Sequence, residues 1–258
     1  MEVCYQRNNL ELIIRNLTKR FGELKALDDV NIEAKKSSIT LVIGPNGSGK
    51  TTLINIITGF LNADKGNVVF ENRDITNLPP HEIFRHGIVR TFQTSQPLRK
   101  LTVLENLLIA EVSYGEGIVQ SFKRDWVEKE KKLVDKAFWI LGFLGIEHMW
   151  DEEARNLSGG QLRLLEIGRA LMCQARLMVM DEPIAGVAPA LSHIILKKLK
   201  ELSNRGISFL IVEHRLDLVL KYVDWVYVMA RGRIVAKGKA MEIIENPEVV
   251  EVYMGAQG

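Results

Sequence analysis

The sequence predicts an α/β fold built around a parallel sheet, and three observations lead to this prediction. Short apolar segments typical of strands alternate along the chain with longer segments that have helical spacing. One of these strands, 38–43, enters a glycine-rich turn that a helical segment follows. Another, 177–180, ends in two carboxylates at 181 and 182, and ligands of α/β proteins bind at the carboxyl ends of parallel strands. The order strand, loop, helix, strand is typical of such a sheet.

Composition excludes several classes of protein. The 258 residues suffice for one large or two small domains, at roughly 150 residues per domain. With 47% hydrophobic and 26% charged residues the chain is not disordered as a whole, and a net charge of +2 gives no overall attraction to nucleic acid. Cys4 and Cys173 are too few for a disulfide framework, so we expect a reducing, cytoplasmic setting. We expect no signal peptide at 1–9 and no membrane-spanning segment.

The first part of the chain predicts strands on both sides of a polar turn at 19–23, which carries one aromatic residue, Phe21. A short helix after the glycine-rich turn leads through a loop into a further strand. The predicted elements are strands at 10–14 and 38–43, a helix at 51–59, a loop at 62–66 and a strand at 67–70.

Residues 102–150 change to helical spacing and predict an inserted helical arm. Three of the four tryptophans lie in it, together with three phenylalanines. These aromatics either fill a small secondary core or form, in part, a surface that docks a partner. The charged stretch 123–132 predicts a solvated helix face.

A second α/β stretch follows the arm. It ends in a hairpin across Arg231 and Gly232 and a tail, 239–258, with a short helix. The predicted elements are helices at 160–172, 190–204 and 216–223 and strands at 177–180, 208–212, 225–229 and 233–236.

Residues 44–51 fit the phosphate-loop pattern of glycine, four residues, and Gly-Lys-Ser/Thr between a strand and a helix. Its glycines let backbone N–H groups point at phosphate oxygens, and the following helix presents its positive end. Lys50 is expected to reach the β- and γ-phosphates, and the Thr51 hydroxyl to bind Mg²⁺. The predicted ATP contacts of this segment are Gly44, Pro45, Asn46, Gly47, Ser48, Gly49, Lys50, Thr51 and Thr52.

The strand-end carboxylates have different expected roles. Asp181 would face Mg²⁺ through water, and Glu182 would orient and deprotonate the attacking water. The alternative is that the acidic pair simply ends a strand or caps a helix.

Leu157-Ser158-Gly159-Gly160-Gln161 matches the signature of ATP-binding cassette (ABC) ATPases, and the chain resembles that family over nearly its whole length. Without the other motifs, Ser158 could be an ordinary helix N-cap. The resemblance implies a P-loop NTPase (RecA-like) α/β core with an antiparallel β subdomain, formed by 1–93 and 157–240. It also implies an inserted α-helical subdomain, 94–156, and a tail, 241–258. The implied ligands are ATP, which the signature residues 157–161 would also contact, and Mg²⁺.

The resemblance assigns roles to three further residues. Phe21 would stack on adenine, although a lone aromatic could equally belong to the core. Gln93 would touch Mg²⁺ and the lytic water, and His214 would contact the γ-phosphate. The sequence departs from the family where Ala188 stands in place of an expected aspartate, which puts a polar contact across the dimer in doubt.

Within the family, the chain is most similar to ATPase subunits of high-affinity branched-chain amino acid importers, on the segments 90–93, 185–189 and 246–255 and the long arm. This implies head-to-tail pairing with an identical or paralogous ATPase, permease subunits contacted through the helical subdomain, and an extracytoplasmic binding protein. The expected location is the cytoplasmic face of the membrane, with no nucleic acid bound. Alternatives are urea importers, other amino acid importers, lipopolysaccharide exporters, and soluble ABC proteins acting on ribosomes or DNA.

Overall fold

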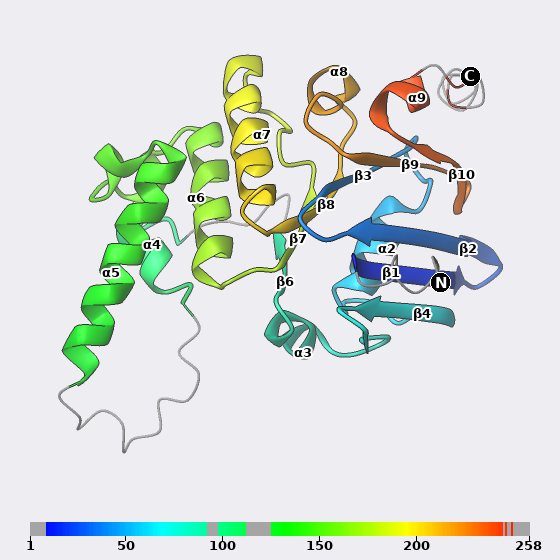
Figure 1. Ribbon diagram of the computed structural model, residues 1–258, viewed down its shortest axis with the longest axis horizontal. Coiled ribbons are helices and arrows are strands. Elements are labelled where there is room, and N and C mark those ends of the chain that lie inside the picture. The colour runs from blue at the N-terminus through cyan, green and yellow to red at the C-terminus, as the bar shows by residue number, and fades with distance from the viewer. Residues whose placement is uncertain (1–8, 92–97, 112–124, 245, 247–248, 250–258) are drawn as a thin grey trace. The chain divides into compact units, whose positions relative to one another are not determined.

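The computed structural model describes residues 9–91, 98–111, 125–244, 246 and 249, and the chain divides into two compact units (Figure 1). The first unit comprises the described residues of 1–93, 176–185 and 193–258, and the second those of 94–175 and 186–192. Within the described ranges, no helix has both the length and the apolar character needed to cross a membrane.

A six-stranded sheet forms the centre of the first unit, in the order β10-β9-β3-β8-β7-β6. All neighbours run parallel except the terminal pair β9 and β10, which form the predicted hairpin. β3 and β8 are buried at every position, as expected for strands covered on both faces. The strands are β3 (Ile39–Ile43), β6 (Ile88–Thr91), β7 (Leu177–Asp181), β8 (Ser208–Val212), β9 (Trp225–Ala230) and β10 (Arg233–Gly238).

The strand register aligns three carboxyl ends of this sheet. Val212 at the end of β8 pairs with Val42 of β3 on one side and with Asp181 of β7 on the other. The residues that follow these three strands therefore leave the sheet at the same edge, where α/β proteins bind their ligands.

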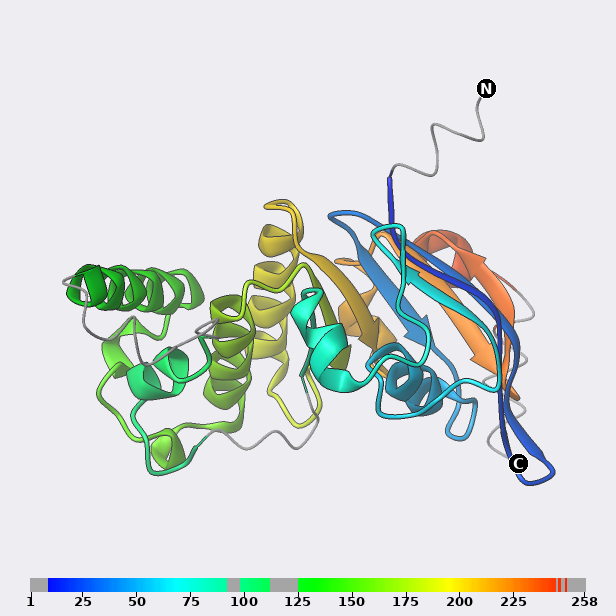
Figure 2. The ribbon, with the colours of Figure 1, turned by 90° about the horizontal axis from the view of Figure 1, so that it is seen from below.

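A second, antiparallel sheet in this unit has the order β2-β1-β4-β5. β1 and β2 make a long twisted hairpin, drawn in blue in Figure 2. Helix α2 (Lys50–Ile57) adds Leu53, Ile54 and Ile57 to an apolar core that both sheets line. The strands are β1 (Leu10–Phe21), β2 (Leu24–Lys35), β4 (Lys65–Phe70) and β5 (Arg73–Asp74).

The prediction of a polar turn at 19–23 is wrong for most of that range. β1 continues to Phe21, and only two residues separate it from β2. β2 was not predicted at all. Its outward-facing positions carry charged residues, so its apolar residues alternate with polar ones and do not form a continuous run. The remaining helices of the unit are short, α3 (Pro80–Arg85), α8 (Leu216–Val219) and α9 (Ala240–Ile244), and α8 ends before the predicted 223.

The second unit is helical, as predicted for the arm. Its helices are α4 (Val103–Leu108), α5 (Asp125–Leu144), α6 (Gly159–Met172) and the short turns η1 (Glu147–Met149) and η2 (Ala154–Asn156). α7 (Pro189–Ser203) begins in this unit and continues in the first.

Aliphatic side chains, among them Ile140, Leu141 and Leu165, form the buried interior of the second unit. Trp139 and Trp150 are 54% and 44% exposed, so of the two alternatives the one in which the aromatics fill a core is wrong for these two. The side chain of Trp126 and residue Phe122 lie outside the described part of the chain.

Candidate functional site

The predicted phosphate loop connects β3 to α2, between Ile43 and Lys50. Gly44 has φ 153°, and a Cβ placed there would lie 2.1 Å from the carbonyl oxygen of Met229 in β9. Gly49 has φ 105°, and its Cβ would lie 2.5 Å from the carbonyl oxygen of Ala26 in β2. Both backbone conformation and close approach therefore require glycine at these two positions.

Lys50 is only 6% exposed, and its side chain lies inside the loop that precedes it. Its Nζ donates to the carbonyl oxygens of Gly44 at 2.8 Å and Pro45 at 2.9 Å. Burial lowers the pKa of the ammonium group, and the nearby carboxylates of Glu182 and Asp181 raise it. A buried cation between a glycine-rich loop and the start of a helix is suited to an anionic ligand such as a phosphate.

Asp181 ends β7 beside this loop. Burial raises the pKa of its carboxyl group, and Arg90, whose guanidinium nitrogen lies 3.8 Å from the carboxylate, lowers it. Arg90 belongs to β6 and donates to Asn55 of α2 at 2.6 Å. Arg90 therefore connects the Asp181 carboxylate to α2, the helix that follows the phosphate loop.

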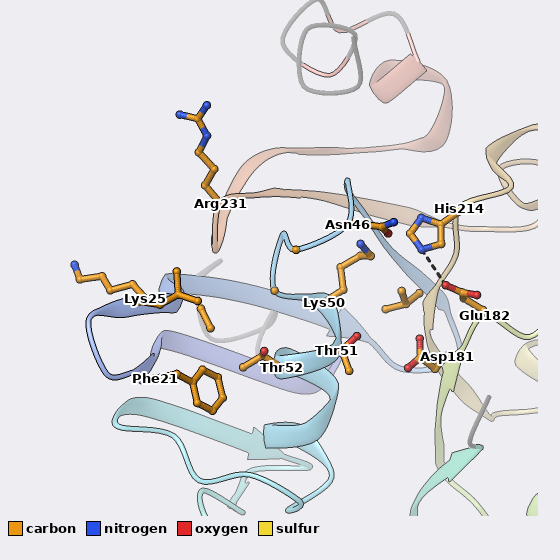
Figure 3. A pocket seen from close by; sticks show the side chains of 15 residues that line it. Phe21, Lys25, Asn46, Lys50, Thr51, Thr52, Asp181, Glu182, His214 and Arg231 are labelled. Atoms are coloured by element: carbon orange, nitrogen blue, oxygen red, sulfur yellow. Dashed lines mark ion pairs between the residues drawn. The ribbon is translucent and has the colours of Figure 1, made fainter. Parts of the chain in front are cut away.

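Glu182 follows Asp181 and has the left-handed φ of 50°, which is uncommon for a residue with a side chain. Its backbone N–H donates to the carbonyl oxygen of Val212 at 2.9 Å. Its Oε1 lies 2.9 Å from Nε2 of His214, a contact drawn as a dashed line in Figure 3. The structure therefore brings together two residues that the sequence assigned to catalysis.

Lys50, Asp181, Glu182 and His214 line one pocket of about 550 Å³ in the first unit. In Figure 3, Phe21 and Thr52 lie on one side of Lys50, and Asp181, Glu182 and His214 lie on the other. Phe21 is 51% exposed, so the alternative that it belongs to the core is wrong. The lining residues are Phe21, Leu24, Lys25, Ala26, Asn46, Gly47, Gly49, Lys50, Thr51, Thr52, Asp181, Glu182, Val212, His214 and Arg231.

The donor set of the pocket fits a magnesium nucleotide. A hydroxyl group, that of Thr51, and the carboxylate of Asp181 are the oxygen ligands that Mg²⁺ prefers. Among the described residues, no group of three or more His, Cys, Asp or Glu side chains could hold a metal by itself.

Sequence reasoning missed Leu24, Lys25, Ala26, Val212 and Arg231 as pocket residues. Arg231 stands at the tip of the β9–β10 hairpin, and the next residue, Gly232, donates its N–H to Ser48 of the phosphate loop at 3.0 Å. No local signal marks these positions, because β2 and the hairpin reach the loop only through tertiary pairing. Gly44, Pro45 and Ser48 shape the loop without lining the pocket, and Gln93 lies outside the described residues.

The signature segment lies in the second unit, where Ser158 is the N-cap of α6. The Ser158 hydroxyl accepts the Gln161 N–H at 3.4 Å, and the Gln161 side chain accepts the Ser158 N–H at 2.8 Å. Ser158 and Gly159 are exposed, while Leu157 and Gly160 are buried. A Cβ at Gly160 would lie 1.9 Å from the Leu191 side chain, so glycine lets Leu191 of α7 pack closely against α6. Ser158 is thus an N-cap, and its hydroxyl keeps a proton to donate.

Comparison with known proteins agrees with this geometry. Residues 27–185 match the family described as ABC transporter. A protein of Archaeoglobus fulgidus, named probable branched-chain amino acid transport ATP-binding protein LivG, is 63% identical over 243 residues, which cover 94% of this chain and 95% of that protein. A Methanocaldococcus jannaschii protein of the same name is 56% identical over 255 residues, covering 96% and 99%.

A solved structure of similar fold is described as the ADP conformation of an ATP-binding cassette of an ABC transporter. It is 55% identical in sequence, has a TM-score of 0.85, and covers 95% of this chain and 99% of its own. The chain therefore shares its architecture with an ATP-binding cassette over nearly the whole length of both chains.

Proposed function

The chain belongs to the ATP-binding cassette ATPases of ABC transporters, and from that premise we propose that it powers import of branched-chain amino acids. The named relatives support this substrate class, since both align over nearly their full lengths. The single observation that supports hydrolysis at the described pocket is the pairing of Glu182 with His214 beside Lys50.

The predicted site residues have the following proposed roles in hydrolysis. The loop N–H groups and Lys50 bind the β- and γ-phosphates, and Phe21 stacks on adenine. Thr51, Gln93 and Asp181 would hold Mg²⁺, which when bound neutralises charge on the phosphate oxygens.

Glu182 orients a water molecule and accepts its proton as the water oxygen bonds to the γ-phosphorus and the bond to the ADP oxygen breaks. His214 contacts the γ-phosphate and holds the carboxylate of Glu182 in place. The 2.9 Å contact between the two side chains supports the proposal that His214 positions Glu182.

We further propose that two cassettes pair head to tail, so that residues 157–161 of one contact the ATP held by residues 44–52 of the other. Ser158 and Gly159 are exposed at the start of α6, where helix N–H groups favour a phosphate. Ala188 is exposed before α7 and offers only backbone groups to a partner. The partner is an identical or paralogous ATPase.

The remaining proposals concern the wider transporter. Residues 94–156 form the helical subdomain that contacts permease subunits at the cytoplasmic face of the membrane. Residues 1–93 and 157–240 form the core with its β subdomain, and 241–258 the tail. An extracytoplasmic binding protein delivers the amino acid, and no nucleic acid takes part.

The test is ATP turnover by the full chain and by Glu182→Gln, with Glu128→Gln, an exposed glutamate of α5, as the control. We expect Glu182→Gln to bind ATP, to accumulate as a dimer, and to lose about 10²–10⁴-fold in kcat, the range of a general base. Undiminished turnover would refute the base assignment. For the substrate class, a strain lacking this gene should lose leucine uptake and regain it only with the wild-type chain.

A further inference from the structure

We infer that Glu213 is a positioning residue for hydrolysis, because its carboxylate ties the segment after Glu182 to the segment that carries His214. This inference rests on the proposed function, since it concerns the same site. Glu213 does not line the pocket, and it acts through the two residues that do.

The two carboxylate oxygens of Glu213 bind different segments. Oε1 accepts the backbone N–H of Ile184 at 2.9 Å, and Oε2 accepts the backbone N–H of His214 at 3.1 Å. Ile184 lies two residues after Glu182 in the chain. One side chain therefore fixes the backbone on both sides of the Glu182–His214 contact.

Glu213 is 1% exposed, so its carboxylate is held almost entirely out of water. Burial raises the pKa of this group, and hydrogen bonds from the backbone of Ile184, His214 and Arg215 lower it again. A buried carboxylate is costly unless such donors satisfy it. Only a group that accepts at both oxygens can serve both segments, and a glutamine offers one acceptor and one donor group.

The Glu182 backbone needs such support. Its φ of 50° is a strained conformation that persists only when the surroundings hold it. The Glu182 N–H bond to Val212 holds one side of the residue, and the Glu213 bond to Ile184 holds the other. Together with the contact between Glu182 and His214, these bonds join the ends of β7 and β8 at three points.

Loss of the Glu213 carboxylate should therefore disturb the chemical step more than nucleotide binding. The phosphate loop follows β3 and makes none of the bonds described for Glu213. A displacement of about 1 Å at a catalytic group costs about 10²-fold in rate. We expect Glu213→Ala to lower kcat by about that factor, and Glu213→Gln, which keeps one acceptor, by about tenfold.

The matched control is Glu11→Gln. Glu11 is a second buried carboxylate of the same unit, 4% exposed and hydrogen-bonded to Ser208, the residue that begins β8. Glu213 follows the other end of the same strand. A purely structural role of a buried glutamate would affect both variants alike.

The experiment measures kcat, the dissociation constant for a fluorescent ATP analogue, and amide hydrogen exchange in peptides covering 182–186 and 212–216, on the full chain. We expect kcat to fall in both Glu213 variants, the dissociation constant to stay within about twofold, and exchange to rise in both peptides. Glu11→Gln should leave kcat within about twofold of wild type. Should Glu213→Ala fail to fold, Glu213→Gln, which preserves shape, carries the test.

Wild-type kcat in a folded Glu213→Gln would overturn the inference, as would a loss of nucleotide affinity that matches the loss of kcat. Glu182→Gln run in parallel separates this failure from that of the proposed function. Turnover retained by Glu182→Gln, or absent in the wild type, would overturn the proposed function instead.

Discussion

Replacing Arg90 by methionine removes a cation that connects three parts of the first unit. Its guanidinium donates to Asn55 at 2.6 Å and to Thr58 at 3.3 Å, both on or next to α2. It lies 5.6 Å from the ring centre of Phe60 and 3.8 Å from the carboxylate of Asp181. Methionine keeps an apolar side chain of similar length, so the substitution removes the polar contacts with little loss of packing.

The expected loss of stability follows from these contacts. The 2.6 Å hydrogen bond to Asn55, which has a charged donor, contributes about 1.5–3 kcal/mol, and the 3.3 Å bond to Thr58 is too long to add much. A cation over a half-exposed ring contributes about 0.5–1 kcal/mol. The ion pair with Asp181 is left out of the sum, because loss of Arg90 lets the pKa of that carboxyl rise. The sum is about 2–4 kcal/mol, which for a chain of this size lowers the melting temperature by about 4–16 °C.

The assay is thermal unfolding of the full chain, with Arg176→Met as the control. Arg176 also pairs with a carboxylate, Glu71 at 2.5 Å, but its side chain is 61% exposed. Exposed ion pairs contribute only about 0–1 kcal/mol, so this control should unfold near the wild type. Equal shifts in the two variants, or a shift of less than about 2 °C in Arg90→Met, would refute this reasoning.

Three further substitutions test packing and pH dependence. Gly160→Ala should cost about 1–3 kcal/mol in unfolding free energy, because its Cβ would lie 1.9 Å from Leu191, whereas Gly159→Ala meets nothing within 4 Å and should cost nothing measurable. Burial raises the pKa of Glu11 in the folded state above its ordinary 4.5, so the folded state binds the proton more tightly than the unfolded state does. The folded state therefore loses stability as pH rises from the unfolded-state pKa to the folded-state pKa. Glu11→Gln removes this loss while keeping an acceptor for Ser208, so its melting temperature minus that of the wild type should rise from pH 4 to pH 8; a constant difference would contradict the assignment.

Local patterns predicted the parts of the site that short segments encode. The phosphate loop was predictable because its glycines, Lys50 and Thr51 are contiguous and stand between a strand and a helix. Asp181 and Glu182 were predictable because an apolar strand runs directly into them. The start of α6 was predictable from Ser158 and Gln161, which form a capping box.

Features that depend on tertiary pairing were not predictable. Arg231 and Lys25 reach the pocket because the β9–β10 hairpin and β2 contact the phosphate loop, and nothing in their own segments indicates this. β2 itself was missed because its exposed face is charged. In the arm, the tryptophans suggested a core that aliphatic residues form, because helical spacing identifies a face without telling which side chains it buries.

The alignment of the strand-end residues depends on strand register, which explains why the sequence predicted Asp181, Glu182 and His214 but not the distances between them. Val212 pairs with Val42 and with Asp181, so residues just beyond these three positions leave the sheet side by side. Shifting β8 by one residue would turn every side chain on it to the opposite face and carry His214 away from Glu182. The Glu182 N–H bond to Val212 belongs to this same register. The pairing of β7 with β8 therefore determines the catalytic geometry, and Glu213, the first residue beyond β8, reinforces it where the strands separate.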